Sequence, residues 1–245
     1  DAVEVDDKPT CASDENLKLD FEAGAIIVKD VNAQYAKEMD VKVAARTTAV
    51  KPAGTTSLVV GSSSGIHAWH SDYYIRRIRV AKDEAIYKYL LEHNPELLED
   101  EYFSPKTQAI ISVPQKAADG AITRNESTLD LLERVKLISK YWVKTGHISG
   151  NNTHNVSCTV SIRPDEWKII GEWMWVNKEY YNGLSVLPFD GGSYKQTPFE
   201  ECTKEVYEEM FSKLNDIDLS NIIENNDDTS FNESVACGGG SCEIS

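Results

Sequence analysis

Residues 51–80 read KPAGTTSLVVGSSSGIHAWHSDYYIRRIRV, and the rest of the fold is organised around this stretch. In its first part Pro52 fixes φ, Gly54 permits unusual backbone angles, and the hydroxyl residues 55–57 follow, a composition typical of a tight turn that opens a helix. Unpaired backbone N–H groups at a helix start, together with hydroxyls and the helix dipole, can bind a phosphate without a lysine. Local chemistry leaves two interpretations open, an ordinary structural turn and an anion site.

The residues on either side of this turn predict strand, turn, helix and loop in that order. We expect a strand over Val41–Val50, a short helix over Thr55–Val60, a glycine- and serine-rich loop over 61–65, and a strand over Tyr74–Val80. The last strand carries three cations, Arg76, Arg77 and Arg79. They form either an exposed basic face or a phosphate-facing end of the strand. His67 and His70 could be read as metal ligands, but no second ligand pair follows at a suitable spacing, so no metal site is predicted.

Further along, the apolar pattern predicts several helices and strands. The expected helices are Asp30–Met39, Asp83–His93, Ser127–Lys144, a helix after Pro164, and Pro198–Leu214; the expected strands are Thr107–Pro114, Asn155–Ile162 and Gly183–Pro188. The helix over Ser127–Lys144 is predicted to be capped by Ser127, with Asp130 three residues on. The last helix is predicted from a capping box with Thr197 as N-cap, Pro198 at the first position and Glu200 three residues on. Asp190 and Tyr194, in the loop before it, are candidates for lining a pocket. Because strand–helix–strand units occur twice, we expect an α/β fold with a largely parallel sheet.

Composition limits the classes of function. The chain has 245 residues, 41% of them hydrophobic, and a net charge of −15. That charge opposes binding to nucleic acid, and no apolar run approaches the roughly 18 residues of a membrane span. Five scattered cysteines and no apolar leader predict a cytoplasmic protein.

Both ends of the chain are expected to be flexible. Residues 1–20 form an acidic leader around Pro9, and from Asn215 onward there is no lysine or arginine. This second segment ends in Cys237-Gly-Gly-Gly-Ser-Cys242. Two thiols separated by four flexible residues can close a disulfide, whereas two ligands alone make a weak metal site. We therefore expect three parts: a leader over 1–20, an α/β body over 21–214, and a flexible tail over 215–245 that carries the cysteine pair.

From about Val41 to the end, the chain resembles adenosylcobalamin-dependent (class II) ribonucleotide reductases, in particular the ribonucleoside-triphosphate reductases. The resemblance rests on residues 51–80, on residues 155–203 (NVSCTVSIRPDEWKIIGEWMWVNKEYYNGLSVLPFDGGSYKQTPFEECT) and on CGGGSC at 237–242. It implies that the chain forms the C-terminal part of a ten-stranded α/β barrel. It also implies that the substrate's phosphates are bound by Ala53, Gly54, Thr55, Thr56 and Ser57. The family commonly has Ser or Thr at the position of Ala53, which places one hydroxyl contact in doubt.

The resemblance further implies adenosylcobalamin as cofactor, a ribonucleotide as substrate, and reduction through a cysteine thiyl radical. Cys237 and Cys242 would pass electrons from a thioredoxin-like donor to the active site. The radical cysteine and its neighbours lie upstream of the matched region in the family, and the chain begins at Asp1. We therefore expect a fragment or split subunit whose partner is the missing N-terminal part of the reductase. The alternative is a non-catalytic nucleotide-binding or docking subunit of a split reductase.

Overall fold

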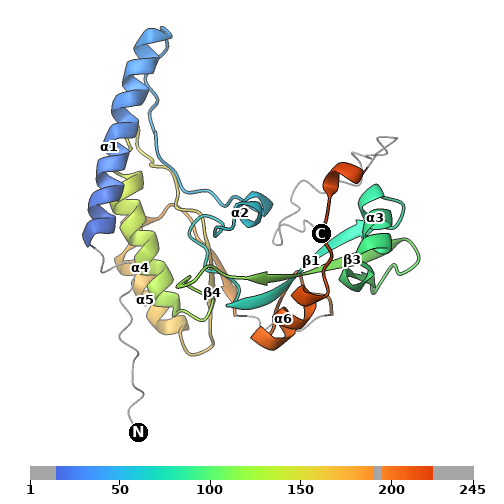
Figure 1. The fold of residues 1–245 in the computed structure, drawn as a ribbon. Coiled ribbons are helices and arrows are strands. Elements are labelled where there is room, and N and C mark those ends of the chain that lie inside the picture. The colour runs from blue at the N-terminus through green and yellow to red at the C-terminus, as the bar shows by residue number, and fades with distance from the viewer. Residues whose placement is uncertain (1–14, 190–194, 223–245) are drawn as a thin grey trace. The chain divides into compact units, whose positions relative to one another are not determined.

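The computed structural model describes residues 15–189 and 195–222, shown as the coloured ribbon in Figure 1. The chain divides into two compact units, each with its own hydrophobic core. Unit 1 comprises Asp1–Ala53, Ser63–His67 and Glu126–Asp190, and unit 2 comprises Gly54–Ser62, Ala68–Asn125 and Gly191–Ser245. None of the helices within the described ranges combines the length and the apolar character needed to cross a membrane.

Unit 1 begins with a long helix, α1 (Glu15–Glu38). Its first turns pack on η3 (Ser139–Val143), the π-helical turn that continues α4 (Thr128–Ile138). There the Phe21 and Trp142 rings lie 6.2 Å apart, and a Cβ at Gly24 would lie 3.4 Å from Trp142. The helix predicted over Asp30–Met39 is therefore present, but it begins 15 residues earlier than predicted, at Glu15. The predicted mobile leader is wrong for residues 15–20, which are helical because this apolar packing stabilises them.

The core of unit 1 lies between helices and a pair of parallel strands. Strands β4 (Thr159–Ile162) and β5 (Ser185–Pro188) pair in parallel, and α5 (Trp167–Val176) connects them. This confirms the predicted strand–helix–strand unit over this part of the chain. The predicted cap of α4 is also confirmed, since Ser127 accepts a hydrogen bond from the Asp130 amide. The largest fully buried side chains of this core are Leu132, Val135, Val143, Val156, Val160, Ile162 and Ile170.

The expected strand over Val41–Val50 does not form a ladder. Arg46 and Val50 each make one isolated bridge, to His147 and Val156. The segment is held instead by the end of α4, which continues as a π-helical turn, η3 (Ser139–Val143). The buried Thr48 hydroxyl donates to the Trp142 carbonyl (2.7 Å). Side-chain bonds to a helix end have thus replaced strand pairing, and the chain reaches Pro52 from this anchor.

Unit 2 is built on a four-stranded sheet in the order β2-β3-β1-β6, in which every pairing is antiparallel. Its elements are α2 (Thr55–Val59), β1 (Tyr73–Ala81), α3 (Ala85–His93), η2 (Pro95–Leu97), β2 (Leu98–Asp100), β3 (Gln108–Lys116), β6 (Phe199–Glu201), α6 (Lys204–Ser212) and η5 (Leu219–Asn221). The expectation of a largely parallel sheet is wrong here. Strand β3 runs antiparallel to both of its neighbours, β1 and β2, and β6 runs antiparallel to β1. The α/β class is confirmed, while the ten-stranded barrel stays a prediction.

The capping box predicted at Thr197 is wrong. Phe199–Glu201 forms β6, which pairs with β1, and the helix begins later, where Thr203 accepts a hydrogen bond from the Val206 amide (3.3 Å). Strand pairing along β1 places Glu200 beside Arg77, a long-range contact that outweighs the local helix signal.

The beginning of the predicted tail is attached to unit 2. The Asn215 amide donates to Oδ1 of the fully buried Asn94 (2.7 Å), and the Asp218 amide donates to the Tyr89 hydroxyl (3.0 Å). The expected flexible tail is therefore wrong for residues 215–222. The rest of it, and most of the acidic leader, lie outside the described residues.

His70 lies in an aromatic cluster on this sheet, with its ring stacked on Phe199 (5.6 Å between centroids) and near Tyr74 (6.0 Å). Burial, and after it the nearby Arg124 charge, lower the pKa of His70 from 6.5 to about 4. The ring nitrogen Nε2 is buried without a hydrogen-bond partner. His70 is therefore a neutral core residue at physiological pH.

Gly146 provides a test of the anchor around Thr48. A Cβ at position 146 would overlap the Thr48 side chain. We expect Gly146→Ala to lower the free energy of unfolding by about 1–3 kcal/mol, the usual cost of overpacking, as measured by urea denaturation. Gly171→Ala is the matched control, because a Cβ there meets nothing within 4 Å. A Gly146→Ala variant as stable as the control would contradict the close packing.

His70 predicts a pH dependence of stability. The unfolded chain takes up a proton on this histidine near pH 6.5, whereas the folded chain does so only near pH 4. Stability should therefore fall as the pH falls from about 6.5 to about 4. His70→Phe should flatten this part of the profile, measured as the free energy of unfolding against pH. His93→Gln, at an exposed histidine, is the control. An unchanged slope in His70→Phe would refute the assignment.

Candidate functional site

The predicted turn and helix after Pro52 are present. Gly54 has φ +57°, a conformation that glycine adopts without strain, and α2 starts at the next residue. A Cβ at Gly54 would meet no heavy atom within 4 Å, so the turn is open on that side. Within unit 2 the sequence thus builds an exposed left-handed turn that leads into a short helix, as the hydroxyl-rich stretch predicted.

The hydroxyls of the turn fall into different environments. The Ser57 hydroxyl donates to the Gly54 carbonyl (2.7 Å), and Ser57 is buried, so this side chain braces the turn. Thr56 is exposed to solvent. Thr56 is therefore the residue of this turn whose described side chain is available to a ligand.

Ala53 is the last residue of its segment of unit 1, and its backbone amide already has a hydrogen-bond partner. Its N–H donates to the Ser64 hydroxyl oxygen at 3.0 Å. An amide engaged in this way holds the chain in place. It can contact a phosphate only by leaving or sharing this bond, so the phosphate contact predicted for the Ala53 amide stays a prediction.

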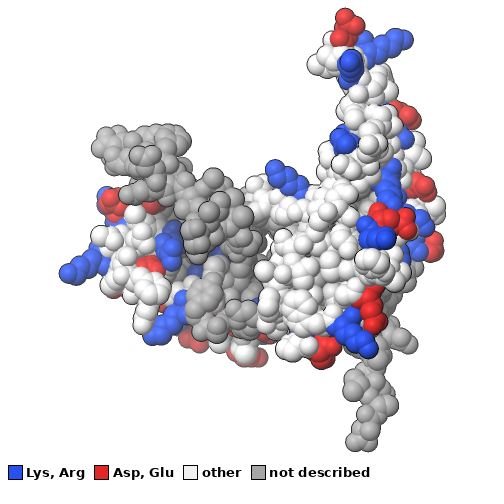
Figure 2. Space-filling view, turned by 180° about the vertical axis from the view of Figure 1, so that it is seen from behind, with Lys and Arg blue, Asp and Glu red and all other residues white. Residues whose placement is uncertain are grey.

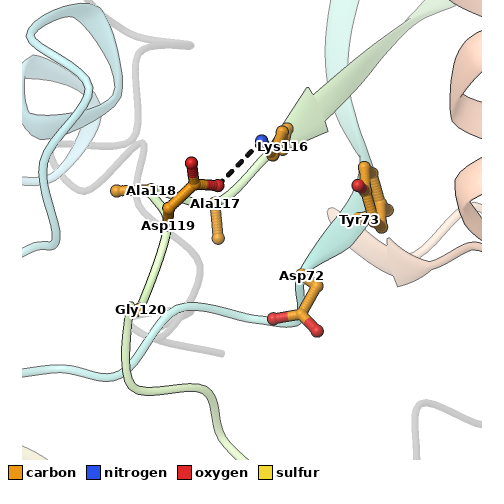
Figure 3. Close-up of a pocket in the computed structure, with 7 residues that line it drawn as sticks. All are labelled: Asp72, Tyr73, Lys116, Ala117, Ala118, Asp119 and Gly120. Atoms are coloured by element: carbon orange, nitrogen blue, oxygen red, sulfur yellow. Dashed lines mark ion pairs between the residues drawn. The ribbon is translucent and has the colours of Figure 1, made fainter.

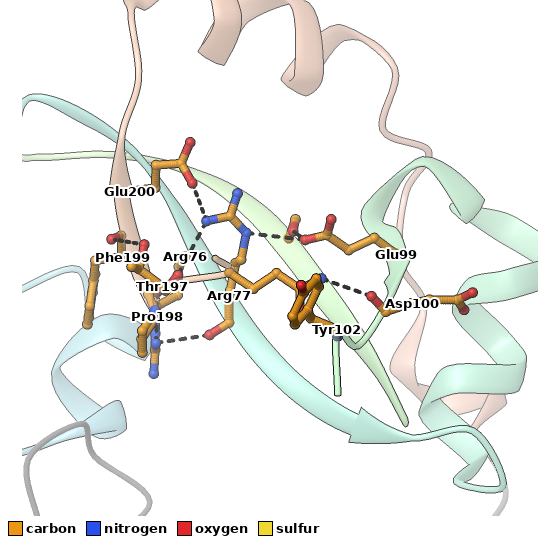
Figure 4. A network of polar contacts seen from close by, with 11 residues as sticks. Arg76, Arg77, Glu99, Asp100, Tyr102, Thr197, Pro198, Phe199 and Glu200 are labelled. Carbon is orange, nitrogen blue, oxygen red and sulfur yellow. Dashed lines mark hydrogen bonds and ion pairs between the residues drawn. The ribbon is translucent and has the colours of Figure 1, made fainter. Parts of the chain in front are cut away.

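Arg76 and Arg77 of β1 are held by contacts within unit 2 (Figure 4). Arg77 lies between Glu99 (3.3 Å) and Glu200, and it also donates to the Thr197 carbonyl. Arg76 donates to the Pro198 carbonyl (3.0 Å), and its guanidinium lies 4.4 Å from the Phe199 ring centroid. These contacts bind β6 to β1.

Arg79, the third arginine of the strand, pairs with the buried carboxylate of Glu101 (3.2 Å). The structure thus gives all three arginines partners inside the fold. Arg79 alone is exposed, with 61% of its side chain accessible, so the exposed basic face predicted from the sequence is confined to this residue, and the phosphate-facing end stays a prediction. The contacts of the three arginines hold the sheet together. They are structural ion pairs and cation–π contacts of the sheet.

Cys237 and Cys242, the predicted redox pair, lie outside the described residues, as do Asp190 and Tyr194. The cysteines that the structure describes, Cys158 and Cys202, are free thiols. Burial raises the pKa of the Cys158 thiol to about 11, and burial followed by nearby Glu200 and Glu201 raises the pKa of Cys202. Neither thiol is therefore activated as a nucleophile at neutral pH.

A pocket of about 270 Å³ opens beside the ends of β1 and β3 (Figure 3). Two of its three charged side chains, Lys116 and Asp119, lie toward each other and are paired at 2.8 Å, while Asp72 lies apart from them. This pairing raises the pKa of Lys116 and lowers that of Asp119. No group of three or more potential metal ligands occurs among the residues in the described ranges. The pocket therefore presents a satisfied ion pair, and we assign it no chemistry.

Two residues near the predicted site were not assigned a functional role from the sequence. Ser64 was read as part of a loop, and His67 was weighed only as a metal ligand. In the structure His67 bonds to Ser64 and to the Thr159 amide. The sequence places Ser64, Gly65 and His67 close to the turn, which was the signal available for such a role. The partner of His67, Thr159, lies 92 residues away, so the contact itself could not be read from the sequence.

Comparison with known proteins gives a consistent set of relatives. The adenosylcobalamin-dependent ribonucleoside-triphosphate reductase of Euglena gracilis is 30% identical over 208 residues, which cover 83% of this chain and 27% of the relative. The enzyme of the same name from Lactobacillus acidophilus is 29% identical, covering 90% and 29%. That from Lactobacillus leichmannii is 25% identical, covering 89% and 29%. No protein-family model matches the chain.

The fold has a counterpart among solved structures. The crystal structure of a B-12 dependent (class II) ribonucleotide reductase matches with a TM-score of 0.70 and 23% identity, covering 82% of this chain and 27% of that one. The chain thus spans less than a third of the length of these relatives. It is homologous to part of the adenosylcobalamin-dependent (class II) ribonucleotide reductases.

Proposed function

We propose that this chain is part of an enzyme that reduces ribonucleotides, with ribonucleoside triphosphates as the preferred substrates, to 2′-deoxyribonucleotides. The observation that carries the proposal is the match of 83–90% of the chain to reductases of one named activity. Two free described thiols agree with a reducing cytoplasm. In this proposal the chain supplies the phosphate-binding turn and the terminal thiol pair.

The geometry around Gly54 supports the role of the turn. The first amides of a helix have no intrahelical acceptor, and the helix dipole favours an anion there. Gly54 keeps the backbone accessible, and Thr56 presents a hydroxyl to solvent. Because the β1 arginines are already paired, phosphate recognition would rest on amides and hydroxyls rather than on these side-chain cations.

Adenosylcobalamin is the cofactor named for the relatives, and the pocket beside β1 and β3 does not fit it. The pocket of about 270 Å³ is polar and lies below the range of about 300–1,000 Å³ that is usual for drug-sized ligands. A corrin ring is larger than such ligands. We therefore assign no described residue to the cofactor and derive no step through it. In our proposal it initiates radical chemistry in the part of the reductase that this chain does not supply.

The thiol pair would serve the reducing step. Replacing the ribose 2′-hydroxyl by hydrogen releases water and oxidises two active-site thiols to a disulfide. Cys237 and Cys242 can reduce that disulfide by thiol–disulfide exchange, becoming a disulfide themselves, and a thioredoxin-like dithiol then restores them. The sequence supports this role through the glycines between the two cysteines, which allow the pair to turn within a narrow site.

We further propose that the rest of the reductase packs against unit 1. Strands β4 and β5 form a two-stranded parallel sheet, and parallel strands normally lie within larger, buried sheets. On α5, Trp175 and Val176 are 73% and 74% exposed. If the remaining length is a separate polypeptide, the chain is a docking subunit of a split enzyme, and the same surface would bind that polypeptide.

Thr56→Val tests phosphate binding by the turn. In the reductase that contains this chain, loss of the hydroxyl should weaken ribonucleotide binding about tenfold, as expected for a hydrogen bond to a charged group. Equilibrium binding of the substrate is the measurement. Thr56→Ser keeps the hydroxyl and should bind like the wild type. If both variants bind normally, the hydroxyl has no such role.

Cys237→Ser/Cys242→Ser tests the shuttle. With a thioredoxin-like protein as reductant, the double variant should stop after the first turnover, because the active-site disulfide is no longer regenerated. With a small dithiol that enters the site directly, turnover should persist. Rates with the two reductants, measured side by side, distinguish the outcomes. Loss of both activities would argue against a shuttle and for a structural defect.

A further inference from the structure

Ser64 and His67 connect Ala53 to the core of unit 1 by a continuous series of hydrogen bonds. The Ala53 amide donates to the Ser64 hydroxyl oxygen (3.0 Å). The His67 ring contacts the Ser64 carbonyl through Nδ1 (2.8 Å) and the Thr159 amide through Nε2 (3.1 Å). All four residues belong to unit 1. We call this series the Ser64–His67 relay.

The partners of His67 fix its tautomer. A backbone amide can only donate, so Nε2 accepts from Thr159, and a carbonyl can only accept, so Nδ1 carries the proton and donates to Ser64. Both ring nitrogens are therefore used, which locks the orientation of the ring. Because the ring is hydrogen-bonded through both nitrogens, it fixes the distance between the backbone at Ser64 and the backbone at Thr159.

The element at the far end of the relay belongs to the buried core of unit 1. Thr159 is the first residue of β4, whose Val160 and Ile162 are 0% and 1% exposed. The segment that carries the relay is also held at other points. The Arg134 guanidinium donates to the Ile66 carbonyl (3.2 Å), and a Cβ at Gly65 would lie 3.4 Å from the Lys51 carbonyl oxygen. Gly65 has φ +61°, so a glycine suits both this turn and its close approach to the chain before Pro52.

We propose that Ser64 and His67 are positioning residues for ribonucleotide binding, which fix the start of the phosphate-binding turn relative to the unit 1 core. The inference rests on the proposed function of that turn. The relay fixes the position of Ala53, the first residue of that turn, within unit 1. A turn that binds through backbone amides has no flexible side chain with which to correct a misplaced start. The relay thus acts on affinity for the phosphates and not on the chemical step.

The test compares relay variants in the reductase that contains this chain. Ser64→Ala removes the acceptor of the Ala53 amide. His67→Asn can still donate near Nδ1 but cannot reach the Thr159 amide. Each should raise KM for the ribonucleotide about fivefold to tenfold and leave kcat within about twofold, because uniform binding is lost. Ser64→Thr keeps the hydroxyl and His67→Gln keeps an acceptor near Nε2, so both should recover much of the affinity.

Two measurements distinguish a specific effect on phosphate binding from a general disturbance of the nucleotide site. A ribonucleoside without phosphates, used as a competitive inhibitor, should keep its inhibition constant in Ser64→Ala and His67→Asn. The double variant should be no worse than the poorer single variant, because both substitutions interrupt the same relay. Equal loss of nucleoside and nucleotide affinity, or fully additive effects, would overturn the proposal.

The controls distinguish failure of this inference from failure of the proposed function. Ser63→Ala alters the neighbouring serine, which lies outside the relay, and should leave KM unchanged. If Thr56→Val weakens nucleotide binding while Ser64→Ala and His67→Asn do not, the turn binds phosphate and the relay proposal is wrong. If all of these variants bind normally, the role proposed for the Thr56 hydroxyl and the relay proposal both fail.

Discussion

The hydrogen bond from the Thr48 hydroxyl to the Trp142 carbonyl is the contact on which the first half of the chain depends. The segment before Pro52 has no strand ladder, so its position comes from hydroxyl and indole contacts with the end of α4. The π-helical turn at Ser139–Val143 contributes to this arrangement, because its wider bonding pattern displaces backbone groups at the helix end. Gly146 then lets Thr48 approach that end closely. One buried threonine thus holds the segment that leads to Pro52.

Charges inside each unit are largely used to hold the unit together. In unit 2, Arg77 joins Glu99 of β2 to Glu200 of β6 across β1, and in unit 1 Arg134 pairs with Glu126 while holding the Ile66 carbonyl. Figure 2 shows Lys and Arg side chains mixed with Asp and Glu side chains along α1. Desolvation offsets much of the Coulomb energy of a buried or half-buried pair of this kind, so its net contribution to stability is smaller than its short distances suggest.

Local signals predicted the elements whose structure is decided locally. The cap at Ser127, the left-handed glycine turn at Gly54, and the strand–helix–strand unit at 159–188 follow from caps, turn residues and apolar periods, and the structure contains all of them. The errors have a common cause in long-range contacts. The Thr197 capping box was a sound local pattern, but Phe199 and Glu200 are held as a strand by Arg76 and Arg77 of β1. The Ser64–His67 relay could not be foreseen for the same reason, since its two ends lie far apart in sequence.

The net charge of the chain explains why preorganisation matters for an anionic substrate. A net charge of −15 repels a nucleoside triphosphate, and salt screens this repulsion beyond about 8 Å. Since the β1 arginines are already paired, affinity in the proposed site must come from short-range donors. Oriented amides bind an anion well only when their direction is fixed before the ligand arrives, because ordering them on binding would consume the same free energy that the contacts supply. The bonds that hold Thr48, Ser64 and His67 are formed during folding. In the proposed site, the free-energy cost of holding Ala53 would therefore fall on the stability of unit 1 rather than on the binding step.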